Sequence, residues 1–298
     1  MIRIRIASVI TSVLASICVI AMSSSTAFAA TLNGVDYSGW QSASAPCYTA
    51  NGGAEFGIVK LTQGTSYKNY SAASQLACLR ATGQETGAYH YASGGNPENE
   101  ARFFVSEAMR LGVVKSGILA LDFESNQNWA WGNPEWIQRF VVSVHAQTGV
   151  WPVVYIQASG LWQLNPFVRA NCAIWVAQYA SNAATGFQSN PWNLGSAGES
   201  IRQYSSNGWV AGVGPLDLNL FMGSRSQWRK LATSNNGVTT NPATQQPATQ
   251  AKPASPSKVC VTVRSGDTLS SIAANHGGSI SSWSVPSGNR NLIYPGIS

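Results

Sequence analysis

Two acidic side chains stand at the end of an apolar stretch in the middle of the chain. Residues 117–124 read Gly-Ile-Leu-Ala-Leu-Asp-Phe-Glu without helical periodicity, which predicts a strand buried on both faces. Side chains alternate along a strand, so Asp122 and Glu124 should point to one side and Phe123 to the other. Neighbouring carboxyl groups shift each other's pKa, and such a pair can supply the proton donor and the charged group that glycosidic cleavage needs. The alternative is a strand that simply runs into a solvated acidic loop.

The elements around this strand alternate between strands and helices. Apolar runs predict strands at 34–38, 56–62, 87–91, 152–157 and 172–179. Helical patterns fall at 69–82, 96–111, 135–147 and 159–164, and Asn-Pro pairs at 96–97 and 133–134 predict two of the helix starts. After residue 179, strands at 201–204 and 216–221 follow without an intervening helix. This order predicts an α/β fold, an irregular (β/α) barrel of parallel strands with helix-poor C-terminal strands.

The barrel would gather four acids at one mouth, because the active sites of such barrels lie at the carboxyl ends of the strands. Asp36 ends the first strand, Asp122 and Glu124 end the central one, and Asp217 lies in the last strand, next to the first if the barrel closes. This convergence favours a chemical role for the acid pair. Four other acids lie mostly on helices and are expected to be solvated or capping: Glu98, Glu100, Glu107 and Glu135.

Aromatic side chains near the same strand ends could stack on sugar rings. They are Tyr89, Tyr91, Trp129, Trp131, Tyr155, Trp175 and Tyr204. Each of them could instead be a core residue, but Trp129 and Trp131 follow the acid pair in a polar loop and are favoured as ligand contacts. His90 is expected to be a packed histidine rather than a base.

Residues 1–29 have the pattern of a signal peptide. Arg3 and Arg5 precede an apolar run, and Ala27-Phe28-Ala29 forms an A-x-A cleavage site. We expect cleavage after Ala29, with Ala30 as a second position and an uncleaved membrane anchor as the alternative. No other stretch is apolar enough to span a bilayer. The mature protein is therefore expected to be secreted, without a membrane anchor.

The formal net charge of +6 does not indicate a nucleic-acid partner. Residues 30–231 hold 12 Lys and Arg against 11 Asp and Glu, and the excess lies in the leader and the C-terminal tail. Nucleic-acid binding needs a clustered basic face, and none is visible. A charged content of 10% with 11 Trp and 10 Tyr favours uncharged or sugar-like ligands. No phosphate-binding loop is present, and we expect no cofactor and a monomer.

Four cysteines remain after removal of the leader. Cys47 and Cys78 are expected to form a disulfide, because both lie in the first quarter of the large domain and export permits such bonds. Cys172 opens an apolar run and is expected to be a buried free thiol. Neither the cysteines, with Cys260 included, nor the three histidines have the spacing of metal ligands, so no metal site is expected.

The end of the chain differs in composition from the barrel region. Residues 233–258 are rich in Asn, Thr, Gln, Pro and Ala and predict a flexible linker between the barrel, 30–232, and a small unit, 259–298.

Residues 33–231 resemble the glycoside hydrolase family 25 muramidases, the Chalaropsis-type lysozymes. The matching motifs, in order, are Gly34-Val-Asp36-Tyr-Ser38, Gly64-Thr-Ser-Tyr67, Gly87-Ala-Tyr89-His90-Tyr91, Leu121-Asp122-Phe-Glu124, Trp175-Val-Ala-Gln-Tyr179, Gln203-Tyr204-Ser205 and Leu216-Asp217-Leu-Asn219. The resemblance implies a barrel with about five helices and cleavage of the β-1,4 bond between N-acetylmuramic acid and N-acetylglucosamine in bacterial peptidoglycan. It also adds Tyr67 and Gln203 to the substrate-binding candidates. Gln63 departs from the pattern, because relatives often have Glu there.

The resemblance also implies roles for the acids. Glu124 would be the general acid, Asp122 would support the 2-acetamido group of the substrate in a neighbouring-group mechanism with net retention, and Asp36 and Asp217 would complete the site. Two other hypotheses stay open. One is a non-catalytic peptidoglycan-binding protein on the same scaffold, and the other is a barrel glycosidase acting on chitin-like polymers.

The tail resembles a LysM module, a small α+β unit that binds glycan containing N-acetylglucosamine. Residues 261–273 match its opening strand and helix, and 291–296 match its ending. The implied glycan-binding residues are Gly266, Asp267, Thr268, Leu269 and Ile293. The chain stops at Ser298, before the usual final strand, so a truncated, non-binding tail is the alternative. The two units together predict a secreted, cell-wall-associated bacterial autolysin or phage endolysin.

Overall fold

The computed structural model describes residues 30–233, Thr268 and residues 271–272. The chain divides into two compact units, Met1–Gln246 and Pro247–Ser298, and the barrel belongs to the first. The leader, the linker from residue 234 and the tail residues Gly266, Asp267, Leu269 and Ile293 lie outside the described residues, so those boundaries and roles remain predictions. No helix in the described part is long and apolar enough to cross a membrane.

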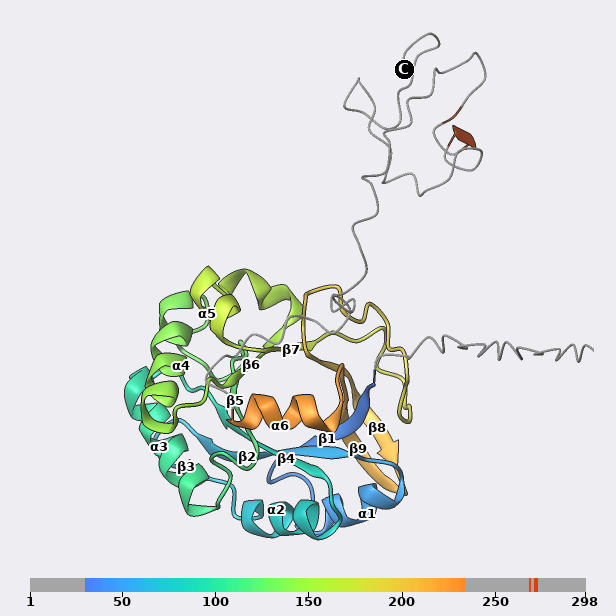
Figure 1. Ribbon diagram of the computed structural model, residues 1–298, viewed down its shortest axis with the longest axis horizontal. Helices are drawn as coiled ribbons and strands as arrows, with labels where there is room; N and C mark the ends of the chain where they lie inside the picture. The colour runs from blue at the N-terminus through green and yellow to red at the C-terminus, as the bar shows by residue number, and fades with distance from the viewer. Residues whose placement is uncertain (1–29, 234–267, 269–270, 273–298) are drawn as a thin grey trace, which may run out of the picture. The chain divides into compact units, whose positions relative to one another are not determined.

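Eight strands close into a barrel (Figure 1). Their order around the barrel is β1-β9-β8-β7-β6-β5-β4-β2, and pairing of β1 with β2 closes it. A two-residue strand, β3 (Tyr67–Lys68), extends β2 at its outer edge. The barrel strands are β1 (Leu32–Tyr37), β2 (Phe56–Gln63), β4 (Glu85–Tyr91), β5 (Ile118–Asp122), β6 (Val153–Gln157), β7 (Ile174–Ala177), β8 (Ile201–Val210) and β9 (Val213–Phe221). The predicted barrel is thereby confirmed.

The last strand corrects the expectation of an all-parallel sheet. β9 runs antiparallel to both β8 and β1, and all other neighbours in the barrel are parallel. A two-residue turn, Ala211-Gly212, joins β8 to β9 with φ angles of 50° and 78°, the left-handed values of a tight hairpin. The prediction found only the two outer ends of this hairpin, residues 201–204 and 216–221, because its middle is polar and contains Gly208.

Helices cover the outside of the barrel where the sequence predicted them. They are α2 (Ala72–Ala81), α3 (Pro97–Arg110) and α4 (Pro134–Thr148). Asn96 accepts a hydrogen bond from Asn99 N, and Asn133 accepts from Glu135 N and Trp136 N, so both Asn-Pro starts act as N-caps. The helix expected at 159–164 is a 3₁₀ helix, η1 (Ala158–Gln163). A further helix, α5 (Pro166–Asn171), was not predicted, although it begins with the same Asn-Pro signal.

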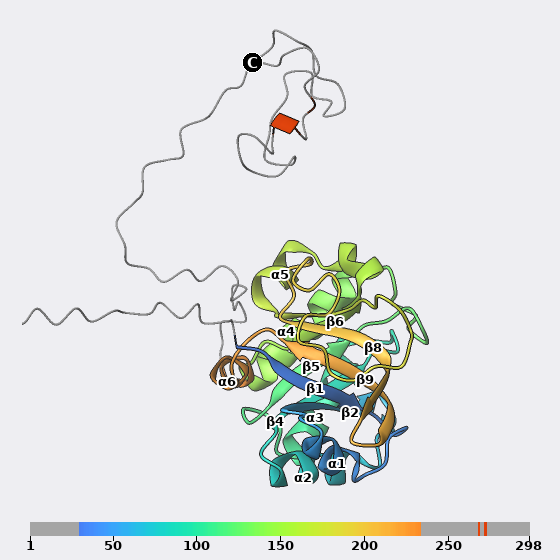
Figure 2. The same cartoon turned by 90° about the vertical axis from the view of Figure 1, so that its right-hand side faces the viewer.

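The prediction also missed the short helices α1 (Ala45–Asn51) and α6 (Arg225–Thr233). α6 buries Trp228, whose ring lies 4.5 Å from Phe56 and 5.2 Å from Phe221 between centroids. The Trp228 Nε1–H donates to Thr86 O at 3.1 Å. Figures 1 and 2 show α6 across the end of the barrel from which β1 starts. The amino-terminal end is therefore closed, and the carboxyl end is left as the mouth.

The strands are buried on both faces, as the apolar run at 117–124 predicted. Ile118, Ala120 and Trp175 belong to a core inside the barrel. Leu119 and Leu121, from the alternate positions, belong to the core between the barrel and its helices. Inward-facing positions therefore recur every second residue, and Asp122 continues the inward series of β5.

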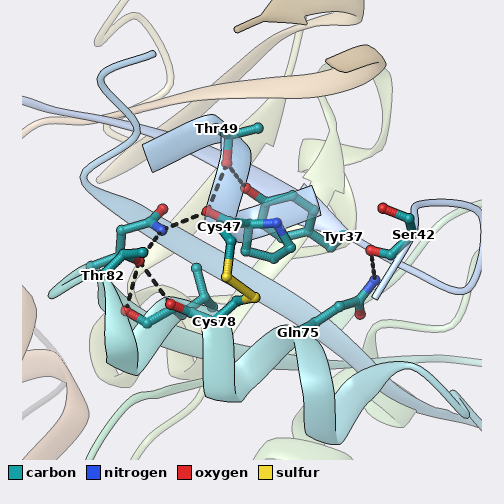
Figure 3. Close-up of a disulfide and its surroundings, with 10 residues drawn as sticks. Tyr37, Ser42, Cys47, Thr49, Gln75, Cys78 and Thr82 are labelled. Carbon is teal, nitrogen blue, oxygen red and sulfur yellow. Dashed lines mark hydrogen bonds between the residues drawn. A yellow bond between two sulfur atoms is a disulfide. The ribbon is translucent and has the colours of Figure 1, made fainter. Parts of the chain in front are cut away.

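A disulfide between Cys47 and Cys78 joins α1 to α2 (Figure 3). Around it, the Tyr37 hydroxyl and Thr49 Oγ1 are hydrogen-bonded at 2.6 Å, and Gln75 Nε2 donates to Ser38 O at 2.9 Å. Cys172 is buried and unpaired among the described residues. The disulfide thus fastens a seven-residue helix that would be marginal alone.

Replacing Cys47 and Cys78 together by Ser should lower the free energy of unfolding by about 2–4 kcal/mol, because the bond closes a chain loop of moderate length. Urea unfolding of the oxidised protein and the double variant measures the difference. Cys172→Ser is the control. Reducing agent should lower its free energy of unfolding by the same amount as it does in the parent. Equal stability of the double variant and the parent would show that packing alone holds α1.

Candidate active site

Asp36 and Asp217 lie opposite each other at the mouth. They are register partners on the antiparallel pair β1–β9, so both side chains lie on the inner face. Asp36 is 6% exposed, and its Oδ2 accepts hydrogen bonds from Gln203 Nε2 at 2.9 Å and Asn219 Nδ2 at 2.8 Å. Burial and the charge of Asp217 raise the pKa of Asp36. Burial and the charge of Glu124 raise the pKa of Asp217 to about 6.

Asp122 and Glu124 form the second acidic pair. Asp122 ends β5 between Tyr91 of β4 and Tyr155 of β6. Phe123 turns outward into the outer core, so the predicted alternation returns Glu124 to the mouth. Burial, and then the charge of Glu124, raise the pKa of Asp122. Burial also raises the pKa of Glu124, and a hydrogen bond with Asp122 partly offsets that rise. The charge of each carboxyl group therefore affects the pKa of the other.

A hydrogen-bonded network fixes the floor of the mouth. Tyr155 and Tyr179 both donate their hydroxyl protons to Gln203 Oε1, which orients the Gln203 amide toward Asp36. Trp175 Nε1 donates to Asn219 Oδ1 at 2.8 Å, and this orients the second amide in the same way. Tyr179 and Asn219 were not among the predicted site residues. Their positions in the matching motifs next to Trp175 and Asp217 were the available signal.

Lys60 is a further site residue that the sequence reading missed. It lies on the inward face of β2, and its Nζ is 4.4 Å from the centroid of the Tyr91 ring. A cation two residues after the inward-facing Ile58 was the signal, because the alternation of the strand places it inside the barrel. Burial lowers the pKa of Lys60, and the charges of Asp122 and Glu124 oppose that shift.

The predicted aromatic contacts fall into three groups. Tyr91 and Tyr155 flank Asp122 in the strand register, and Tyr89 faces the inside of the barrel. Burial raises the pKa of each of these hydroxyls, and the nearby carboxylates raise it further. Tyr67 is 41% exposed and Trp129 is 93% exposed, so both rings are open to solvent.

The third group does not line the mouth. Trp175 is 2% exposed and lies in the core inside the barrel, where it donates to Asn219 and packs edge-on against Tyr155, with 4.6 Å between ring centroids. Trp131 stacks on Phe123 in the outer core, 5.7 Å between centroids. Tyr204 is next to the inward-facing Gln203, so it faces outward, and its hydroxyl accepts from Gln188 N. These three rings present no open face beside the acids.

The acids outside the mouth are mostly neutralised by nearby partners. Glu98 pairs with Arg139, and Glu135 lies exposed in the first turn of α4. Glu100 and Glu107 are buried rather than solvated, which corrects the prediction for these two. Glu100 binds His90 at 2.9 Å, and Glu107 binds Lys68 and Arg110. By contrast, no ion pair of the described residues includes any of the four acids of the mouth.

A cleft of about 700 Å³ opens between the β2–β3 loop, the segment from the end of β4 into α3 and the loop that follows β5. Its lining residues are Gln63, Gly64, Thr65, Ser66, Tyr67, Ser93, Gly95, Asn96, Asn99, Glu100, Gln127 and Trp129. Gln63 Nε2 donates to Gln127 Oε1 at 3.0 Å and links the two loops. The carboxylate of Glu100 is hydrogen-bonded to His90 Nε2, Ser93 N and Gly95 N. The cleft therefore presents hydroxyls, amides and two aromatic rings.

Within the described ranges, no group of three or more His, Cys, Asp or Glu side chains could hold a metal ion. The chemistry that these residues can perform is proton transfer and charge stabilisation by carboxyl groups. A closed barrel with such acids at the carboxyl ends of its strands, beside aromatic and amide groups, is typical of barrel glycoside hydrolases.

Comparison with known proteins identifies the family. Residues 35–213 match the family model of the glycosyl hydrolases family 25, and residues 261–296 match the LysM domain. The chain is 30% identical over 221 residues to an N,O-diacetylmuramidase of Chalaropsis sp., a match that covers 68% of this chain and 100% of the relative. It is 29% identical over 231 residues to Lysozyme M1 of Streptomyces globisporus, covering 69% of this chain and 72% of the relative.

Solved structures agree with this result. A bacterial lysozyme from Streptomyces coelicolor superposes with a TM-score of 0.56 at 26% identity, over 70% of this chain and 98% of that chain. A muramidase from Acremonium alcalophilum superposes with a TM-score of 0.53 at 27% identity, over 67% of this chain and 98% of that chain. The chain belongs to glycosyl hydrolases family 25 and is a glycoside hydrolase with a C-terminal LysM domain.

Proposed function

We propose that the protein is a muramidase that hydrolyses the β-1,4 bond between N-acetylmuramic acid and N-acetylglucosamine in bacterial peptidoglycan. The observation that carries this proposal is the group of four acids at the mouth, none of them in an ion pair among the described residues. The names of the relatives, a diacetylmuramidase and a lysozyme, support the choice of substrate. The cleft has Tyr67 and Trp129 in its lining together with hydroxyl and amide side chains, which suits N-acetylated sugars with their hydroxyls, amides and ring faces. None of the four acids lines the cleft, so it would hold sugars beside the acids and not the reacting bond.

Glu124 is the proposed proton donor, because it is partly exposed and can reach a glycosidic oxygen, whereas Asp122 is 6% exposed. Asp122 Oδ1 is buried and has no hydrogen-bond partner among the described residues. We assign this atom to the N–H of the substrate's 2-acetamido group. The acetamido oxygen then attacks C1 as the C1–O bond breaks, and the Glu124 proton goes to the leaving oxygen. Water opens the resulting oxazolinium ring, returns a proton to Glu124 and leaves the configuration retained.

Product analysis tests the bond that is cleaved. Purified peptidoglycan is digested with the full chain, the new reducing ends are reduced with borohydride, and the sugar alcohols are identified. The proposal expects muramitol. Glucosaminitol, or release of chito-oligosaccharides from chitin at a comparable rate, would favour the chitin-type glycosidase, and no new ends would favour a binding protein.

The LysM domain supports a second part of the proposal, that the tail binds the cell wall. A tail that binds glycan raises the concentration of the barrel at its polymeric substrate. Deleting residues 234–298 should reduce the fraction of protein that sediments with purified walls by about tenfold or more, because two tethered sites bind more tightly than one. Hydrolysis of short soluble muropeptides by the closed barrel should be unchanged. Equal sedimentation of both forms would make the tail non-binding.

The compartment belongs to the same proposal. The leader pattern at residues 1–29 and the two wall-directed units favour a secreted, cell-wall-associated monomer, either a bacterial autolysin or a phage endolysin exported by the host pathway.

A further inference from the structure

Lys60 is held at the wall of the mouth by groups that leave its charge intact. Its Nζ donates to Gln63 Oε1 at 2.8 Å and lies 4.4 Å and 5.4 Å from the ring centroids of Tyr91 and Tyr67. An amide oxygen and two ring faces stabilise an ammonium ion without neutralising it. In the described part of the chain, no carboxylate lies within salt-bridge distance of this nitrogen.

The strand register directs this charge toward the acidic pair. Lys60 pairs with Tyr89 of β4, and two residues further along β4, Tyr91 pairs with Asp122 of β5. The contact of Nζ with the Tyr91 ring therefore places the ammonium on the side of the barrel from which Asp122 projects. Consistently, Lys60 lowers the pKa of both Asp122 and Glu124.

The other ionisable groups near Lys60 are known from the elements packed around it. They are Tyr67 on β3, Tyr89, His90 and Tyr91 on β4, Asp122 and Glu124 at the end of β5, and Asp36 and Asp217 across the mouth. The nearest other cation along the chain, Lys68, forms a salt bridge with Glu107 at 2.7 Å. Lys60 is thus the cation, among the described residues, whose charge reaches the acidic pair.

We propose that Lys60 is an electrostatic positioning residue, whose uncompensated ammonium keeps one carboxyl group of the Asp122–Glu124 pair ionised while the other holds the catalytic proton. Without this charge, burial and the neighbouring carboxylates would favour two protonated groups up to a higher pH. The neutral side chain of Gln63 is needed for this role of Lys60, because a carboxylate in its place would form an ion pair with Lys60. The inference rests on the proposed muramidase activity.

The test compares pH–rate profiles on purified peptidoglycan. In Lys60→Met, both the rising and the falling limb of the pH–rate profile should move to higher pH by about one unit. The reason is that a nearby opposite charge lowers a carboxyl pKa by roughly that amount or more, and the variant loses this charge. Lys60→Arg should restore the parent profile. Gln63→Glu should shift both limbs in the same direction as Lys60→Met but less. Lys68→Met, a lysine paired with Glu107, is the matched control and should superpose on the parent.

The outcomes are distinct from a failure of the proposed function. A Lys60→Met enzyme with lower kcat but an unmoved profile, or an arginine variant that behaves like the methionine one, would overturn the inference. If the parent shows no muramidase activity, ¹³C NMR titration of the side-chain carboxyl groups still reads the effect of Lys60. The titration of the Asp122–Glu124 pair should move to higher pH in Lys60→Met, and an unmoved titration would refute the role.

Discussion

Glu124→Gln is expected to lower kcat on peptidoglycan by about 10³-fold or more and to leave binding to the wall unchanged. The amide keeps the size and polarity of the side chain but has no acidic proton to give to the leaving oxygen. The amide also removes the negative charge at position 124 that raises the pKa of Asp122. Reducing-end release and wall sedimentation, measured on the same preparation, separate the two effects.

Glu135→Gln is the matched control, since Glu135 is an exposed glutamate in the first turn of α4. It should retain the parent rate. A Glu124→Gln enzyme with more than about a tenth of the parent kcat would contradict the assignment, because loss of a general acid removes at least two orders of magnitude. Asp122 would then be the next candidate for the proton donor.

Asp217→Asn is expected to change activity and stability in opposite directions. The folded protein holds the pKa of Asp217 at about 6, whereas an unfolded aspartate titrates near 3.9. Between these values the folded state binds more protons than the unfolded state, so the stability that this group contributes is full below about pH 4 and is lost as pH rises through about 6. At pH 7.5 the charge is destabilising, and its removal should raise the free energy of unfolding by roughly 1–3 kcal/mol.

Urea unfolding at pH 4 and pH 7.5 measures this effect, and the stabilising difference should vanish at pH 4. The rate on peptidoglycan should fall at least about tenfold, because the variant loses a charge that faces Asp36 and Glu124. Glu98→Gln serves as the control of opposite sign, since the hydrogen bond from Arg139 lowers the pKa of Glu98. A variant at position 217 that is equally stabilised at both pH values would show that packing, and not the carboxylate, accounts for the gain.

Together, the two substitutions would show that the mouth is arranged for reaction at the expense of stability. The described acids elsewhere mostly have a cation or backbone N–H groups as partners. The four at the mouth have amides, each other and the single charge of Lys60. Burial without neutralisation raises the carboxyl pKa values, which is what a proton donor near neutral pH requires.

The sequence alone determined the features that depend on short stretches of chain. The strands at 34–38, 56–62 and 117–124 follow from local apolar runs, and the helix starts at residues 96–97 and 133–134 follow from Asn-Pro pairs whose side-chain and ring chemistry acts within one turn. The order of the acids along the strands was sufficient to predict that Asp36, Asp122, Glu124 and Asp217 share one mouth. Period-two alternation also decided that Asp122 and Phe123 face opposite ways.

The tertiary structure decided which side of each strand is the inside and how the chain closes. Asp217 was predicted at the mouth, but the reason lies in the antiparallel direction of β9, which brings a residue in the middle of that strand to the level of Asp36. In the closed barrel, Trp175 lies in the inner core, whereas Trp131 and Tyr204 lie in the outer core between barrel and helices. All three are near strand ends in the sequence, so the sequence did not distinguish them. The same closure brought Lys60, an isolated cation in an apolar run, to the acidic pair. Contacts between distant strands depend on direction and register around the whole barrel, and no local pattern of side chains encodes these.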